Sequence, residues 1–121
     1  MSQYDIHRIE INTLADAKDE IKKIGSDPLS IDIMAPKAIS RVIKLKNVLL
    51  QDAIIIKQDM LSIGGEVAVP KNTFELIDKT GDILIMGNLS QLRTLVIKLK
   101  RHYSRLKKIS QEIENVLMDE I

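Results

Sequence analysis

Residues 89–121 carry the pattern that most constrains how this chain of 121 amino acids can fold. Apolar residues recur there at alternating steps of three and four, which is the spacing of one face of an α-helix. A continuous helix of roughly 30 residues would be about 45 Å long, whereas a chain of this length has a radius of gyration of about 14 Å. Part of such a helix would therefore project from the domain. We call these positions, which are apolar except for His102, the C-terminal stripe: Leu92, Leu95, Leu99, His102, Leu106, Ile109, Ile113 and Val116.

The C-terminal stripe allows two interpretations. In the first, one long helix projects and pairs through the stripe with a second copy of the chain, so that the protein is a homo-oligomer. In the second, a kink near residues 102–104 divides the region into two helices that both pack on the domain. Asn88, with Gln91 three residues later, predicts the N-terminal cap in either case. The chain is thus divided into an α/β core at residues 1–88 and a long helix or helix pair at 89–121, within one domain.

The first 88 residues alternate between strand and helix patterns. Four runs are rich in Ile, Leu and Val and are bounded by turn residues, which predicts strands at 4–11, 40–48, 66–69 and 83–86. The last of these is continuously apolar, as in a strand buried on both faces. Since helices alternate with the strands, the predicted fold class is α/β (or α+β), with about four strands in one mixed sheet packed by helices.

Capping residues set the predicted ends of the helices in this core. Thr13 begins a helix that Gly25 ends, and a second helix over 50–63 runs into Gly64-Gly65. A short turn or helix is expected after Asp27-Pro28. Pro36 is expected to keep the residue before it extended.

Composition narrows the class of protein. Hydrophobic residues make up 45% of the chain and aromatic residues only 2%, so the core must consist of branched aliphatic side chains. The net charge is +1, which disfavours a domain-wide basic surface for nucleic acid. The absence of cysteine excludes disulfides, thiolate nucleophiles and Cys-ligated metals. No apolar run reaches the roughly 20 residues of a membrane span, so no membrane association and a cytoplasmic location are expected.

Charge is segregated near the C-terminus, where no acid occurs between Ile83 and Gln111. Four bases recur there at helical spacing: Lys98, Arg101, Arg105 and Lys108. Such a row can bind phosphates or nucleic acid. The interpretation that we favour is a solvated helix face that meets the acidic end of an antiparallel copy.

The sequence contains no recognisable set of catalytic residues, and no metal or cofactor site is predicted. The best candidate for a ligand site is Lys57, a charge on an apolar helix face, with Glu66 just after Gly64-Gly65; Lys37 is a weaker candidate. The alternative is that Lys57 lays its stem on the core and carries its ammonium group to water. We favour this alternative.

Three linked segments carry a family resemblance: GSDPLSIDIMAPKA (25–38), IIKQDMLSIGGEVAV (55–69) and DILIMG (82–87). Together they resemble the N-terminal accessory domain of dihydropteroate synthases of the clostridial and archaeal type, over roughly residues 4–115. The resemblance implies no catalytic residue, because the pterin and p-aminobenzoate sites of that family lie in a separate TIM barrel. Where the family tends to have helix breakers, this chain has His102-Tyr103-Ser104, which favours the continuous helix.

The resemblance implies a non-catalytic accessory or regulatory module, possessing no enzymatic activity and linked to the synthesis of pterin or folate-like cofactors. Its partner would be a barrel-type synthase in trans, or a second copy of the chain. An alternative is a domain that binds a pterin or another small anion at Lys57, Glu66 and Gly64-Gly65. A small enzyme is the least favoured of the three functions.

Overall fold

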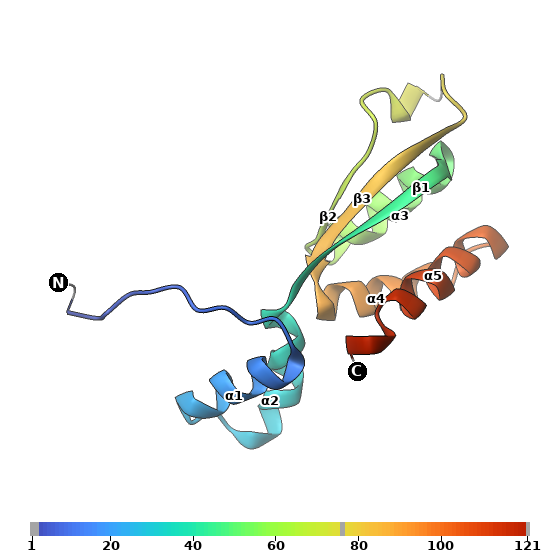
Figure 1. Ribbon diagram of the computed structural model, residues 1–121. Helices are drawn as coiled ribbons and strands as arrows, with labels where there is room; N and C mark the ends of the chain where they lie inside the picture. Colours follow the sequence, from blue (N-terminus) through green and yellow to red (C-terminus); the bar gives the residue numbers. More distant parts are fainter. Residues whose placement is uncertain (1–2, 76, 121) are drawn as a thin grey trace.

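The computed structural model describes residues 3–75 and 77–120, which form three strands, five α-helices and three short 3-10 helices (Figure 1). The first half of the chain contains α1 (Leu14–Ile24), α2 (Pro28–Met34), η1 (Ala35–Ala38), β1 (Ser40–Leu49) and α3 (Leu50–Ser62). The second half contains β2 (Glu66–Ala68), η2 (Thr73–Glu75), β3 (Thr80–Asn88), α4 (Leu89–Leu99), α5 (Ser104–Val116) and η3 (Met118–Glu120). None of the helices in the described part of the chain is long and apolar enough to cross a membrane.

The strands form an antiparallel sheet in the order β1-β3-β2. β1 and β3 pair along their whole length, from Ser40 opposite Asn88 to Leu49 opposite Thr80, with an irregularity between Leu45 and Val48. β2 is short and pairs with β3 only. The prediction of a mixed sheet is therefore wrong, since all pairs of described strands are antiparallel and the sheet has three strands.

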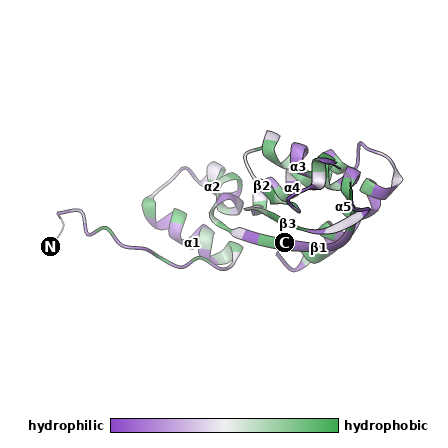
Figure 2. Cartoon of the chain, turned by 90° about the horizontal axis from the view of Figure 1, so that it is seen from above, coloured by the Kyte–Doolittle hydropathy of each residue, from purple (hydrophilic) through white to green (hydrophobic). Residues whose placement is uncertain are grey.

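The missing fourth strand is the one predicted at 4–11. Residues 5–12 are not part of the sheet, although their pattern is typical of a strand. They leave the domain as an extended segment that points away from the sheet in both views (Figures 1 and 2). A strand pattern reports alternation of side chains, whereas strand formation also needs a neighbour that supplies hydrogen bonds.

Helices α3, α4 and α5 cover one face of the sheet, and α1 and α2 lie beside its end (Figure 2). The core lies between these three helices and the sheet. It includes Ile83 and Ile85 of β3, which are buried, whereas Leu84 and Met86 on the other face are half-buried. β3 is thus buried on one face rather than two, because the other face of the sheet carries no helix.

Local capping follows the sequence prediction. The Thr13 hydroxyl accepts a hydrogen bond from the Asp16 N–H at 3.1 Å, and Gly25 ends α1 in the left-handed conformation at φ 83°. Asp27 caps α2 by accepting from the Leu29 N–H at 3.0 Å. The prediction for Pro36 is wrong, since Ala35 is helical at φ −54° and ψ −46°. The disfavoured conformation is tolerated there because α2 continues directly into η1, where Ala35 is fully buried.

The C-terminal region is a helix pair, so the continuous helix is wrong and the kinked alternative is correct. Asn88 and Gln91 form the predicted capping box at the start of α4. The chain breaks after α4 because Tyr103 is extended, at φ −72° and ψ 175°, and α5 then returns across α4 (Figure 1). No proline or glycine breaks the helix at this point. The turn is instead stabilised by the burial of Leu99 before it and Leu106 after it.

The C-terminal stripe therefore lies largely inside the chain. Leu92, Leu95, Leu99, Leu106 and Ile113 are buried in its core, while His102 and Ile109 are half-buried and Val116 is exposed. A stripe that packs on its own sheet does not form a projecting surface for a second copy. Self-association of the chain remains a prediction.

Candidate functional site

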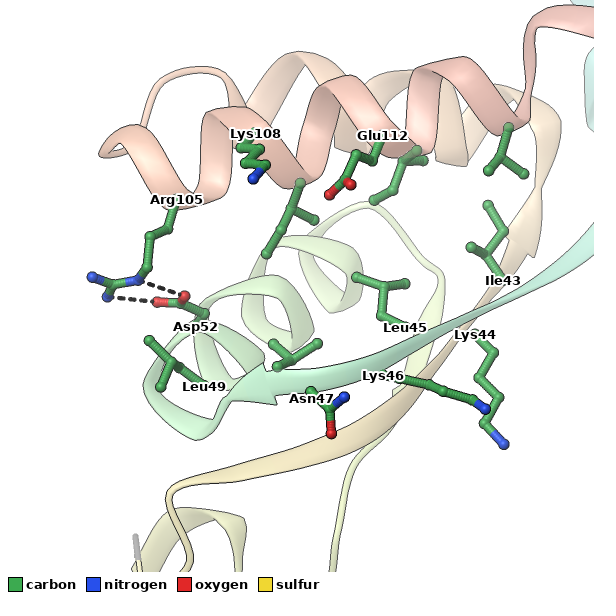
Figure 3. Close-up of a pocket in the computed structure, with 14 residues that line it drawn as sticks. Ile43, Lys44, Leu45, Lys46, Asn47, Leu49, Asp52, Arg105, Lys108 and Glu112 are labelled. Carbon is green, nitrogen blue, oxygen red and sulfur yellow. Dashed lines mark hydrogen bonds and ion pairs between the residues drawn. The ribbon is translucent and has the colours of Figure 1, made fainter.

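A groove of about 540 Å³ lies between β1 and α5 (Figure 3). Its lining includes every residue from 43 to 49, so the groove follows the outer edge of β1. The apolar part of this lining consists of Ile43, Leu45, Val48, Leu49, Ile109, Ile113 and Val116. The polar part consists of Lys44, Lys46, Asn47, Asp52, Arg105, Lys108 and Glu112. No pattern in the sequence predicts this site, because it is formed by two elements that are about 60 residues apart in the chain.

One end of the groove is closed by an ion pair between α3 and α5 (Figure 3). Asp52 lies in the first turn of α3 and is only 2% exposed. The Arg105 guanidinium donates to both of its carboxylate oxygens, Nε to Oδ2 at 2.9 Å and Nη2 to Oδ1 at 3.1 Å. The Tyr103 hydroxyl also donates to Oδ1, and the Arg105 guanidinium lies 4.7 Å from the centre of the Tyr103 ring. Such a bidentate, charge-assisted pair fixes the start of α5 on α3.

The protonation states of this cluster are mutually consistent. Burial raises the pKa of Asp52, but the hydrogen bonds from Arg105 and Tyr103 and the Arg105 charge outweigh burial, so this pKa lies below its usual value. Burial, together with the hydrogen bond to Asp52 and the charge of its carboxylate, raises the pKa of Tyr103. The hydrogen bond to Asp52 also raises the pKa of Arg105. Asp52 is therefore ionised, and its two donors are protonated, at neutral pH. At neutral pH the cluster is therefore an ion pair with an added hydrogen bond that links α3 to the start of α5.

His102 provides a second link between the α4–α5 turn and α3. Its Nε2 lies 2.9 Å from Oδ2 of Asp59, and both side chains are partly buried. This contact explains why the C-terminal stripe contains one polar residue: His102 faces the Asp59 carboxylate of the same chain. Lys100 and Glu114 likewise form an ion pair at 2.8 Å within the chain. Lys100 and Glu114 thus pair within one chain rather than between two copies.

The structure brings Lys57 and Glu66 together, as in the less favoured of the two interpretations of the sequence. Lys57 Nζ lies 3.2 Å from Oε1 of Glu66 and donates to the Val67 carbonyl at 2.8 Å. The Val67 N–H also donates to Glu66 Oε1 at 2.8 Å, and with Lys57 it lowers the pKa of that carboxyl. The pair thus joins α3 to β2. Lys37 lies exposed in η1, on a separate element. Ligand binding by any of these residues remains a prediction.

The Gly64-Gly65 turn has a packing role. Gly64 has φ 92°, the left-handed conformation that favours glycine, and it follows the end of α3. At Gly65, a Cβ would lie 2.4 Å from Cε and 2.8 Å from Cγ of the fully buried Met60. The two glycines therefore let β2 approach α3 closely.

We expect Gly65→Ala to lower the free energy of unfolding by about 1–3 kcal/mol, because the added methyl group overpacks the core against Met60. Urea unfolding followed by circular dichroism measures this loss. In a Met60→Ala background most of the cost should disappear, since the colliding atoms are gone. Strictly additive losses in the double variant would contradict this account.

Among residues 3–75 and 77–120, no group of three or more His, Asp or Glu side chains is arranged to hold a metal ion. The structure thus defines a class of protein: a small domain with a helix-covered sheet, an open groove at one sheet edge, and buried polar groups that tie its helices together.

The chain is distantly similar to a curated protein. The chain is 28% identical over 100 residues to a bifunctional dihydropteroate synthase/dihydropteroate reductase from Helicobacter pylori. The match covers 83% of this chain and 26% of that protein, so the chain spans about a quarter of the length of the curated relative. No protein-family model and no solved structure matches the chain. These findings support a distant relationship to a protein that contains a dihydropteroate synthase.

Proposed function

We propose that the chain is a non-catalytic accessory or regulatory module that acts on a dihydropteroate synthase in trans, in the synthesis of pterin or folate-like cofactors. The observation that carries this proposal is the asymmetry of the match. The match covers 83% of this chain but only 26% of a larger relative whose name includes synthase activity. A domain related to a part of an enzyme can retain the contacts of that part without its chemistry.

The use of the buried polar side chains supports a binding role over a catalytic one. Asp52 is occupied by Arg105 and Tyr103. The hydroxyls of Thr73 and Ser110 donate to nearby backbone carbonyls, each at 2.6 Å. Both hydroxyl-bearing side chains are fully buried, whereas a nucleophile must be within reach of its substrate. These groups stabilise the domain, so we assign its function to binding at the surface.

We place the contact with the synthase on the face of the sheet that carries no helix. Val42 is exposed there, beside Lys44. A shallow depression of about 310 Å³ adjoins them, lined by Lys44, Ala68, Val69, Pro70, Asp82, Ile83 and Leu84. Apolar residues within a polar rim are typical of a surface that binds another protein.

The test uses the dihydropteroate synthase of the organism from which this chain comes. We expect the chain alone to form no dihydropteroate, to form a complex with the synthase in size-exclusion chromatography with light scattering, and to change its KM or kcat by about fivefold or more. Val42→Glu should weaken the complex, whereas Ile24→Glu, at an 81% exposed position on α1, should leave it intact. Turnover by the chain alone, or the lack of any complex, would refute the proposal.

A further inference from the structure

The sheet has an open edge that is long and accessible. β1 is an outer strand of ten residues, and in the described part of the chain β3 is the only strand that pairs with it. Alternate N–H and C=O groups of an outer strand point away from the sheet and can pair with another strand. The groove between β1 and α5 runs along this edge over residues 43–49. A strand added there would hydrogen-bond to β1 and place every second side chain against α5.

The chain also has an extended segment without a place in the sheet. Asp5 has φ 48°, so the regular extended backbone begins at Ile6. Ile6 is 83% exposed and Ile9 is 47% exposed, although both are large apolar residues. Within residues 6–10, His7 and Ile9 share one face, and Ile6, Arg8 and Glu10 share the other. Five extended residues span about 17 Å, so the added strand would lie along residues 43–49 of β1 and cross the irregularity between Leu45 and Val48.

The segment and the edge are complementary in chemistry. Ile9 would pack on the apolar lining that Leu45 and Ile109 contribute, which removes exposed apolar surface from water. Glu10 would lie on the opposite face together with Arg8, on the side of the strand that carries Lys44 and Lys46, and the register that we propose sets Glu10 next to these lysines. Opposite charges on neighbouring strands stabilise such a pair.

The contacts of Ile11 and Asn12, where the segment joins the domain, indicate whether residues 6–10 bind to their own chain or to a second copy. Ile11 packs against the core of its own chain, and the Asn12 carbonyl accepts a hydrogen bond from Arg41 Nη2 at 2.7 Å. These two contacts fix the direction in which residues 6–10 leave the domain, away from the sheet (Figures 1 and 2). A return to its own groove would need a reversal directly at these anchors. A second copy can receive the segment without that reversal, and a two-fold axis makes the exchange reciprocal.

We propose that residues 6–10 of one chain add as a fourth strand to the outer edge of β1 in a second copy, and that the exchange is mutual. The homodimer is held by this pairing and by the burial of Ile9 in the groove between β1 and α5. The inference does not depend on the proposed link to dihydropteroate synthase.

Light scattering at micromolar concentration tests the assembly. The full chain is expected at twice the mass of one chain, and a variant lacking residues 1–10 at the mass of one chain, with an unchanged circular dichroism spectrum apart from the lost residues. Ile9→Asp should raise the dissociation constant by about tenfold or more, because a carboxylate would face an apolar lining. The matched control Ile24→Asp, at another exposed isoleucine, should leave association unchanged. A monomeric full chain, or a dimer that survives the deletion, would overturn the proposal.

Disulfide cross-linking identifies the chain that accepts the segment. The natural sequence has no cysteine, so engineered thiols have no competitors. Mixing a Glu10→Cys chain with a Lys44→Cys or Lys46→Cys chain should give a covalent heterodimer on mild oxidation. When Glu10→Cys and Lys44→Cys are combined in one chain, the product should again be a cross-linked dimer. A disulfide formed only within a monomer would assign the groove to the chain's own segment and overturn the exchange.

Discussion

Leu95→Ala should lower the free energy of unfolding by about 2–5 kcal/mol, because it opens a cavity in a core position. Leu95 is fully buried in the cluster formed by the helices and the sheet. The loss would appear in urea unfolding as a lower midpoint with an unchanged slope. This large effect is expected for a stripe that packs inside its own chain.

Val116 provides the matched control within the same stripe. It is 61% exposed, so Val116→Ala should change stability by less than about 0.5 kcal/mol. If both variants kept wild-type stability and both lost self-association, the stripe would be an interface between copies and the helix pair would be wrong.

Asp52→Asn should lower stability at neutral pH by about 1–3 kcal/mol, because a buried charged acceptor loses its best hydrogen bonds. The carboxylate is held by Tyr103, the N-cap residue of α5, and by Arg105 in the first turn of that helix. Without it, the start of α5 is less firmly held on α3, and the groove that α5 lines loses its fixed width. Asp59→Asn, at the more exposed His102 contact, should cost less in the same assay.

The pH dependence of this effect has a definite sign. The pKa of Asp52 in the folded protein lies below its usual value of about 3.9 in unfolded chains. The carboxylate therefore contributes stability that is fully present above about pH 4 and is lost as the pH falls through the folded pKa. The difference in stability between the wild type and Asp52→Asn should shrink as urea titrations are moved from pH 7 toward pH 3. A difference that stays constant over this range would show that the charge does not matter.

The sequence by itself determined the features that depend on neighbouring residues. The caps at Thr13, Gly25 and Asn88 form as predicted, because each hydrogen bond joins residues that are three positions apart. The helix at 50–63 and the strands at 40–48 and 66–69 match α3, β1 and β2 closely. Lys57 and Glu66 are only nine residues apart and form an ion pair across the Gly64-Gly65 turn, although the interpretation that we favoured carried the Lys57 ammonium group to water.

Only the tertiary structure decided the features that join distant parts of the chain. The C-terminal stripe has one periodicity whether it forms one helix or two, and the break at Tyr103 follows from contacts with Asp52, which is 51 residues away. The groove exists because α5 returns beside β1. The segment before Asn12 has a strand pattern, yet a strand forms only where an edge with open hydrogen bonds is within reach. Local bonding is encoded residue by residue, whereas these outcomes depend on which surfaces meet when the whole chain packs.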